Sequence, residues 1–276
     1  MEESVKRFAD GEVGEVEAVD LLAGERQRRG RPSRSGRPRG LRRGRKMSAC
    51  LAFENLTGGY GSTTIVRDLS GAAAAGEVLC VLGRNGVGKS TLMKLLFGYL
   101  PCRAGRVLLH GKSVDGLDPA ARRRLGMTFC PQERPVFDDL SVRDNLTLMR
   151  NNRHLSPFRS YFARFPILER RLTQHAGTLS GGEKKILSFV RGLAEDQPVV
   201  LLDEPSEGVQ WENILHMDAC IAEKKDAGTA FIVVEQNLAF AERIADRYLV
   251  MDQGRAILEG TRSTVDRERV LAHMHV

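Results

Sequence analysis

The sequence lacks the features that mark several large classes of protein. It has no apolar run close to the roughly 18 residues of a membrane-spanning helix, and its N-terminus contains no apolar signal core. Its five cysteines show no C-x-x-C spacing, and an odd number in mostly apolar surroundings indicates reduced, buried thiols. We therefore expect a cytoplasmic protein whose link to a membrane runs through a partner.

The excess of positive charge lies mostly near the N-terminus. The formal net charge is +7, yet residues 1–46 alone contain 13 Lys and Arg against 8 Asp and Glu. Residues 47–276 therefore carry a net charge of only +2. The basic overall balance thus does not identify a nucleic-acid partner, and we expect no specific nucleic acid.

Residues 24–46 consist of Arg, Gly, Pro and Ser almost without apolar side chains, and such a segment cannot bury enough surface to fold. We predict a disordered N-terminal extension over residues 1–46, followed by one folded domain over residues 47–276. The extension is an arm that binds RNA, DNA or anionic lipid, a tail without such a role, or sequence upstream of a true start at Met47. A strand pattern directly after Met47 favours the last two interpretations.

A glycine-rich run between an apolar stretch and a helix-forming one fits the phosphate-loop pattern G-x-x-x-x-G-K-[ST]. Gly86 and Gly88 allow the backbone to turn its N–H groups toward phosphate oxygens, and Lys89 reaches the β- and γ-phosphates. The hydroxyl of Ser90 is placed to bind Mg²⁺, and the dipole of the following helix adds to the field. The predicted nucleotide-binding residues of this run are Gly83, Arg84, Asn85, Gly86, Val87, Gly88, Lys89, Ser90 and Thr91.

Strand patterns alternate with helical patterns along most of the chain. Residues 199–202 are apolar throughout, which is typical of a strand buried on both faces of a parallel sheet. Residues 51–56 and 63–69 have strand patterns joined by a Gly-Gly-Tyr-Gly turn, and residues 138–195 have helical character. We predict an α/β fold with a mostly parallel sheet core, antiparallel strands at the N-terminus and a helical lobe inserted at about residues 133–195.

Two carboxylates end the predicted buried strand. Asp203 is placed as a partner of Mg²⁺, and Glu204 beside it as the base that orients an attacking water. Catalysis would be electrostatic, because Mg²⁺ and Lys89 neutralise the charge of the γ-phosphate. An acidic pair at a strand end can also cap a helix, but its pairing with a phosphate loop favours the catalytic interpretation.

A second anion site is predicted where the next amphipathic helix begins. Ser180, Gly181 and Gly182 present N–H groups at that N-terminus, and Glu183 completes the sequence Leu-Ser-Gly-Gly-Glu. Together with the phosphate loop and Val-Val-Leu-Leu-Asp-Glu-Pro, this set resembles the nucleotide-binding subunits of ABC transporters. The resemblance implies a P-loop ATPase fold, ATP and Mg²⁺ as cofactors, and ATP hydrolysis coupled to transmembrane transport.

The other markers of that family follow in order. Tyr60 stands where the family keeps an aromatic that stacks on adenine, and Gln132 where it keeps the glutamine that links Mg²⁺ to the helical lobe. In that family the signature of one subunit, here residues 179–183, covers the γ-phosphate held by the phosphate loop of another. The resemblance therefore implies an ATP-dependent, head-to-tail dimer in which residues 180–183 contact ATP.

Two positions depart from the general family pattern. Gln236 stands where a histidine that touches the γ-phosphate is usual, and Gln210 where an aspartate is usual. An amide can hydrogen-bond a phosphate but cannot carry a proton as an imidazole does. We assign Gln236 to the catalytic group, so that either hydrolysis is slow or a glutamine suffices.

These two departures are typical of a narrower group of subunits within that family. Over about residues 50–262 the chain resembles the smaller ATPase subunit of branched-chain amino acid importers and its relative in urea and short-chain amide importers. Residues 206–210 favour the urea relative and residues 234–237 the amino-acid relative, whereas Lys184 and Lys185 stand where glutamines are usual. The resemblance implies a related second ATPase subunit, two membrane permeases and a solute-binding protein as partners, with the chain peripheral to the cell membrane.

Two other classes of function stay open as alternatives. A soluble ABC ATPase of translation or DNA repair would suit the Arg-rich segment, but such proteins usually carry two cassettes or a long coiled-coil insertion, and the sequence has neither. A binding-only regulator without hydrolysis is disfavoured by the presence of Lys89, Asp203 and Glu204.

Overall fold

The computed structural model describes residues 49–150, 152–265 and 267–274. The prediction for residues 1–46 lies outside the described residues, and the first described element is a strand that starts at Ala49. Within these ranges no helix is both long enough and apolar enough to cross a membrane.

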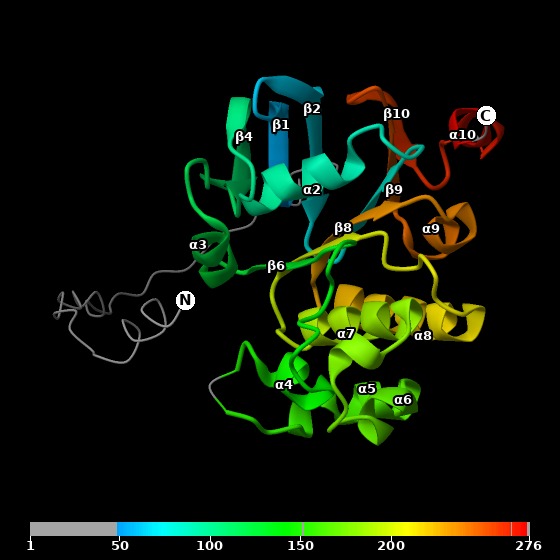
Figure 1. Ribbon diagram of the computed structural model, residues 1–276. Coiled ribbons are helices and arrows are strands. Elements are labelled where there is room, and N and C mark those ends of the chain that lie inside the picture. Colours follow the sequence, from blue (N-terminus) through cyan, green and yellow to red (C-terminus); the bar gives the residue numbers. More distant parts are fainter. Residues whose placement is uncertain (1–48, 151, 266, 275–276) are drawn as a thin grey trace, which may run out of the picture. The chain divides into compact units, whose positions relative to one another are not determined.

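A six-stranded sheet forms the centre of the fold (Figure 1). In chain order its strands are β3 (Val78–Leu82), β6 (Met127–Cys130), β7 (Val199–Asp203), β8 (Ala230–Glu235), β9 (Arg247–Asp252) and β10 (Arg255–Thr261). The spatial order is β10-β9-β3-β8-β7-β6, and every pair is parallel except β10 with β9. Strands β3, β7 and β8 are buried along their whole length, which confirms the mostly parallel core predicted from their apolar sequences.

A four-stranded antiparallel sheet lies beside it, in the order β2-β1-β4-β5. Its strands are β1 (Ala49–Tyr60), β2 (Thr63–Ala74), β4 (Cys102–Leu109) and β5 (Lys112–Ser113). The predicted antiparallel N-terminal strands are confirmed, but the predicted turn is too long, because Gly58, Gly59 and Tyr60 continue β1. The backbones approach closely there, since a Cβ on Gly59 would lie 2.2 Å from the carbonyl oxygen of Thr63.

Helices cover both faces of the six-stranded sheet. Helix α2 (Lys89–Phe97) packs between the two sheets, whereas α7 (Gly181–Leu193), α8 (Trp211–Asp226) and α9 (Leu238–Ile244) pack on the other face (Figure 1). The remaining helices are α3 (Pro119–Arg124), α4 (Val142–Thr147), α5 (Arg159–Arg164), α6 (Pro166–Arg170) and α10 (Arg267–Met274), with 3₁₀ turns at Ser156–Phe158 and Ala176–Thr178. Helices α4 to α7 thus occupy the stretch predicted to form an inserted helical lobe.

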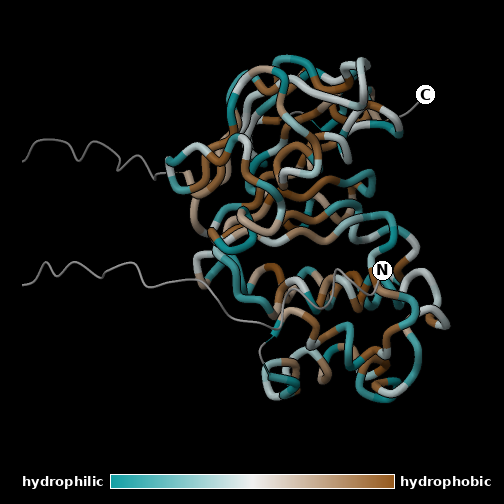
Figure 2. Tube along the Cα trace, turned by 60° about the vertical axis from the view of Figure 1, so that its left-hand side comes forward, coloured by the Kyte–Doolittle hydropathy of each residue, from teal (hydrophilic) through white to brown (hydrophobic). Residues whose placement is uncertain are grey.

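Alternate residues of the central strands contribute to two separate apolar cores. Along β3, the side chains of Val78, Cys80 and Leu82 join the core that contains α7, α8 and α9. Leu79 and Val81 join the core shared with α2 and the antiparallel sheet. Figure 2 shows most of the apolar segments inside the fold and the hydrophilic ones along its outline. Both faces of the sheet are therefore covered, and its functional groups can be offered only at the strand ends.

Candidate functional site

The predicted phosphate loop joins the end of β3 to the start of α2. Gly86 and Gly88 have φ angles of 81° and 109°, in the left-handed region that glycine adopts without a steric penalty. Gly88 is the N-cap residue of α2, and no side chain caps this helix. The first N–H groups of α2 are therefore available to an anion, as the sequence pattern predicts.

Lys89 is buried beneath this loop. Its Nζ donates to the carbonyl oxygens of Gly83 at 2.9 Å and Arg84 at 3.0 Å, and it pairs with Oε1 of Glu204 at 3.2 Å. An ammonium has three hydrogens, so these three acceptors satisfy it completely. Phosphate oxygens that bind Lys89 must replace at least one of these contacts.

Three oxygen-bearing side chains meet beside the loop. Ser90 Oγ lies 3.1 Å from Oδ1 of Asp203 and 3.4 Å from Oε1 of Gln132. Burial raises the pKa of Asp203 to about 6, because the lysines nearby and its bond to Ser90 only partly offset the loss of water. A hydroxyl, a carboxylate and an amide oxygen around one point form a donor set that suits Mg²⁺.

Glu204 is fixed at both its backbone and its carboxylate. Its φ of 49° is left-handed, which is unusual for a residue with a side chain, and its N–H donates to the carbonyl of Val234 at 2.9 Å. Carboxylate Oε2 accepts from the amide nitrogens of Gln132 at 2.9 Å and Gln236 at 2.5 Å. Gln236 therefore lies at the predicted site, and its partner in this structure is the carboxylate of Glu204.

Glu235 is a buried carboxylate of this site to which no role was assigned from the sequence. It is 2% exposed, and its two carboxylate oxygens accept N–H groups from Ser206, Gln236 and Asn237. It thereby joins the turn after Glu204 to the turn that carries Gln236. Burial raises its pKa, whereas the three N–H donors act in the opposite direction. Its place between an apolar strand and Gln236 was the only sequence signal for this role.

Tyr60 borders a cavity of about 410 Å³ that also contains Ser90, Gln132 and Asp203 in its wall. The side chain of Tyr60 is half-exposed, and its hydroxyl accepts a hydrogen bond from Lys94 at 3.1 Å. An aromatic ring at the mouth of a cavity that reaches the phosphate loop is compatible with the predicted contact to adenine. The remaining lining residues are Lys94, Tyr99, Leu100, Phe129, Pro131, Glu133 and Arg134.

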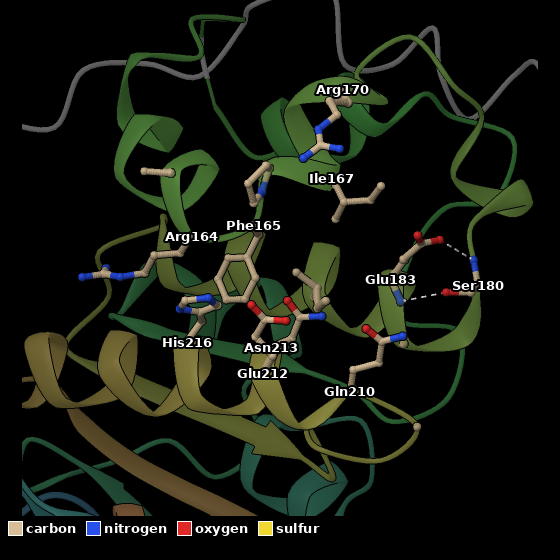
Figure 3. Close-up of a pocket in the computed structure, with 15 residues that line it drawn as sticks. Arg164, Phe165, Ile167, Arg170, Ser180, Glu183, Gln210, Glu212, Asn213 and His216 are labelled. Carbon is tan, nitrogen blue, oxygen red and sulfur yellow. Dashed lines mark hydrogen bonds between the residues drawn. The ribbon is translucent and has the colours of Figure 1, made fainter.

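The predicted signature forms the first turn of α7. Ser180 and Glu183 make a reciprocal capping box, in which each side chain accepts from the other's backbone N–H, at 3.3 Å and 2.9 Å (Figure 3). Within the described ranges, none of residues 180–183 forms a hydrogen bond or ion pair with residues 83–91. Gly181 has no atom near the position of a Cβ, so the helix N-terminus is open on that side.

A second cavity, of about 520 Å³, lies beside the signature between α5, α6, α7 and the start of α8 (Figure 3). Its wall mixes charged, amide and apolar groups, and Phe165 packs edge-on against His216 with ring centroids 5.8 Å apart. The signature residues Ser180, Gly182 and Glu183 border this cavity. The start of α7 is therefore accessible from a hollow of the surface rather than covered by neighbouring elements.

Comparison with known sequences places these features in context. Residues 66–207 match the family described as ABC transporter. The chain is 32% identical over 215 residues to the high-affinity branched-chain amino acid transport ATP-binding protein BraG of Pseudomonas aeruginosa, covering 76% of this chain and 92% of that protein. It is 30% identical over 219 residues to the lipopolysaccharide export system ATP-binding protein LptB of Escherichia coli, covering 77% and 91%.

A solved structure of an ABC transporter subunit has a similar fold. The ATP-binding subunit of an ABC transporter matches this chain with a TM-score of 0.71 at 25% sequence identity, covering 82% of this chain and 99% of the other. The phosphate loop, the strand-end carboxylates and the signature helix thus lie in an architecture that is already known. The P-loop α/β fold predicted from the sequence is confirmed.

Proposed function

This chain belongs to the ABC transporter family as an ATP-binding subunit and an ATPase, and we propose that it energises the import of branched-chain amino acids. The similarity to BraG, whose name records that substrate class, carries the proposal. The sequence Val-Glu-Gln-Asn at residues 234–237 supports it. Similarity to LptB at nearly the same identity means that family membership alone does not select the solute.

A second candidate is import of urea or a short-chain amide. The sequence Ser-Glu-Gly-Val-Gln at residues 206–210 favours it. Glu207 within that sequence also has a defined role in the structure, because its Oε2 accepts hydrogen bonds from Gln132 at 3.0 Å and from Lys185 at 3.3 Å. The two candidates share the ATPase chemistry and differ only in the solute that the complete transporter carries.

In the proposed site, the loop N–H groups and Lys89 bind the phosphates of ATP. Ser90, Asp203 and Gln132 would hold Mg²⁺, which would neutralise phosphate charge when bound. Glu204 accepts the proton of the attacking water, and Gln236 keeps that carboxylate oriented. Tyr60 contacts the adenine ring.

The proposed partner contributions follow from the signature. Among the described residues, residues 180–183 form no hydrogen bond or ion pair with the phosphate loop of their own chain, and the N-terminus of α7 is open at Gly181. We assign these residues to the ATP held by a second, related ATPase subunit, which supplies its own signature in return. Two permease subunits would hold the pair at the membrane, through the surface near residues 132–145, and a solute-binding protein would complete the importer.

Transport is tested by identifying the genes that neighbour the gene for this chain, co-expressing the chain with any permease and second ATPase found among them, and reconstituting the complex in vesicles. A branched-chain amino acid with its binding protein is expected to stimulate ATP hydrolysis. Stimulation by urea or a short-chain amide instead would select the second candidate. Stimulation by neither, together with genes for an export system, would overturn import.

The site is tested separately by Glu204→Gln. General-base catalysis contributes about a hundredfold or more, so turnover is expected to fall by at least that factor while ATP still binds. The variant should also trap an ATP-bound dimer that size-exclusion chromatography resolves. Glu204 would lose its role if the variant hydrolysed ATP at the parental rate.

A further inference from the structure

Helix α7 carries two adjacent lysines with different surroundings. Lys184 pairs with Asp138 at 2.8 Å on the outer side of the helix, and its side chain is 22% exposed. Lys185 is only 10% exposed. Its Nζ donates to the backbone carbonyl of Glu204 at 3.0 Å and to Oε2 of Glu207 at 3.3 Å. Through Lys185, helix α7 therefore contacts the turn that contains Glu204, the proposed base.

The contact to the carbonyl of Glu204 acts on a strained backbone. With a φ of 49°, Glu204 adopts a conformation that a non-glycine residue keeps only when its surroundings enforce it. The N–H of Glu204 is held by Val234 on β8, and its carbonyl is held by Lys185 on α7. Both peptide groups are fixed by different elements, so the direction of the carboxylate depends on both.

The contact to Glu207 acts on Gln132. Carboxylates only accept hydrogen bonds, so the amide nitrogen of Gln132 faces Glu204, at 2.9 Å, and Glu207, at 3.0 Å. The amide oxygen is thereby left toward Ser90, on the side where the metal would bind. The ammonium of Lys185 offsets the charge of Glu207 and so allows two carboxylates to share one amide.

We propose that Lys185 and Glu207 act as a pair of positioning residues for hydrolysis, which fix the backbone of Glu204 and the orientation of the Gln132 amide. The inference rests on the proposed role of Glu204 as the base. It also predicts that a displacement of α7 is transmitted to the base, because one side chain of that helix holds the base's own peptide group. Lys185 lies outside the phosphate loop and has no direct contact with Lys89 or Ser90 among the described residues.

The test measures kcat and KM for ATP with the full-length chain and its Lys185→Gln variant. A hydrogen bond from a charged donor is lost, so kcat is expected to fall roughly tenfold, with KM changed by less than about twofold because the phosphate loop is untouched. Lys185→Arg keeps the charge and the donors and is expected to restore at least half of the parental kcat. Lys184→Gln is the matched control, one residue away on the same helix, and should keep parental values.

A double-mutant comparison tests whether the two residues act together. The combined loss in Lys185→Gln/Glu207→Leu is expected to be smaller than the product of the two single losses. If thermal melting shows that Lys185→Gln is not folded, Lys185→Met, which keeps the aliphatic part of the side chain, replaces it.

The proposal would be overturned by a parental kcat in Lys185→Gln, by an equal loss in Lys184→Gln, or by a loss in Lys185→Arg as large as in Lys185→Gln. The proposal would also be overturned if the loss of kcat in the double variant equalled the product of the losses in Lys185→Gln and Glu207→Leu. Glu204→Gln distinguishes this failure from failure of the proposed site. If that variant loses turnover and Lys185→Gln does not, only the positioning role falls.

Discussion

Lys89 and Glu204 form a buried ion pair, with 3.2 Å between Nζ and Oε1 and side chains that are 3% and 4% exposed. The lysine proposed to bind phosphates is thus paired with the carboxylate proposed to act as the base. A phosphate that binds Lys89 must displace at least one of the three acceptors of its ammonium. If Glu204 is the acceptor displaced, one oxygen of the proposed base becomes free when the nucleotide arrives, and occupancy of the phosphate loop is coupled to release of that base.

The first prediction concerns the stability of this pair. Removal of one partner leaves an uncompensated charge in the interior, so Lys89→Met should lower the free energy of unfolding by roughly 3 kcal/mol. Lys89→Met/Glu204→Gln should recover part of that loss, because position 204 then no longer carries a buried carboxylate without its cationic partner. Urea denaturation without nucleotide measures both. Lys94→Met, on the same helix but at its surface, is the control, and a larger loss in the double variant than in Lys89→Met would contradict the prediction.

The second prediction concerns Gln236. Gln236→Met keeps the size of the side chain but removes the donor to Glu204, so turnover should fall roughly tenfold, as for a lost hydrogen bond to a charged group. Gln236→His can still donate one hydrogen bond and should retain more activity than Gln236→Met. Steady-state hydrolysis at saturating ATP measures the order. Gln253→Met, in the turn between β9 and β10, should match the parent, and equal rates in all three variants would remove Gln236 from the site.

The third prediction concerns the buried guanidinium of Arg122. It is 2% exposed and donates to the carbonyls of Leu95, Leu96 and Leu117, which closes the C-terminal end of α2. Arg122→Met removes these three hydrogen bonds, after which the carbonyl of Leu95 still accepts from the N–H of Gly98 at 3.2 Å, and should cost roughly 2–4 kcal/mol of unfolding free energy. Arg124→Met, two residues further along and exposed, should stay within about 0.5 kcal/mol. A chemical denaturation curve for each variant settles the comparison, and similar midpoints would show that water satisfies these carbonyls.

The fourth prediction concerns pH and Cys130. Burial raises the pKa of this thiol to about 12, so the folded state keeps it protonated at a pH where the unfolded chain loses the proton. The contribution of the protonated thiol to the free energy of unfolding is complete at pH values below the pKa that Cys130 has in the unfolded chain. It declines as the pH rises toward the pKa of the folded state, by about 2 kcal/mol at pH 10. Guanidinium denaturation of the parent and Cys130→Ala at pH 8 and pH 10 isolates the effect. An identical decline in both proteins would exclude it.

Much of the fold could be predicted because its central strands have almost entirely apolar sequences. Residues 199–203 are apolar until their final carboxylate, and burial on both faces follows from that pattern alone. The N-terminal hairpin was harder. Gly58 and Gly59 favour a turn by composition, but in the structure both continue β1. Gly58 packs closely against the side chain of Leu95 on α2, and Gly59 lies against the backbone of β2, and a local sequence pattern contains neither neighbour.

The site was predictable in its residue types and less so in its contacts. The phosphate loop and the acidic pair have fixed spacing, so their meeting at one edge of the sheet could be expected. The hydrogen bonds of Lys185 and the three N–H donors around Glu235 could not, because they join elements far apart in the sequence. The only early signal for Lys185 was a lysine at a position where relatives usually carry glutamine.

The order of the central strands also fixes the distance between the C-terminal ends of β3 and β7. Strand β8 lies between β3 and β7, with Leu82 beside Glu235 and Asp203 beside Val234. Neighbouring strands are about 4.8 Å apart, so the exits of β3 and β7 are about 10 Å apart. Backbone hydrogen bonds between the strands therefore set the distance between the residue at which the phosphate loop begins and Asp203, which directly precedes the proposed base. Substitutions inside the strands should alter how well the domain holds together, whereas substitutions one residue beyond their ends should alter how fast it works.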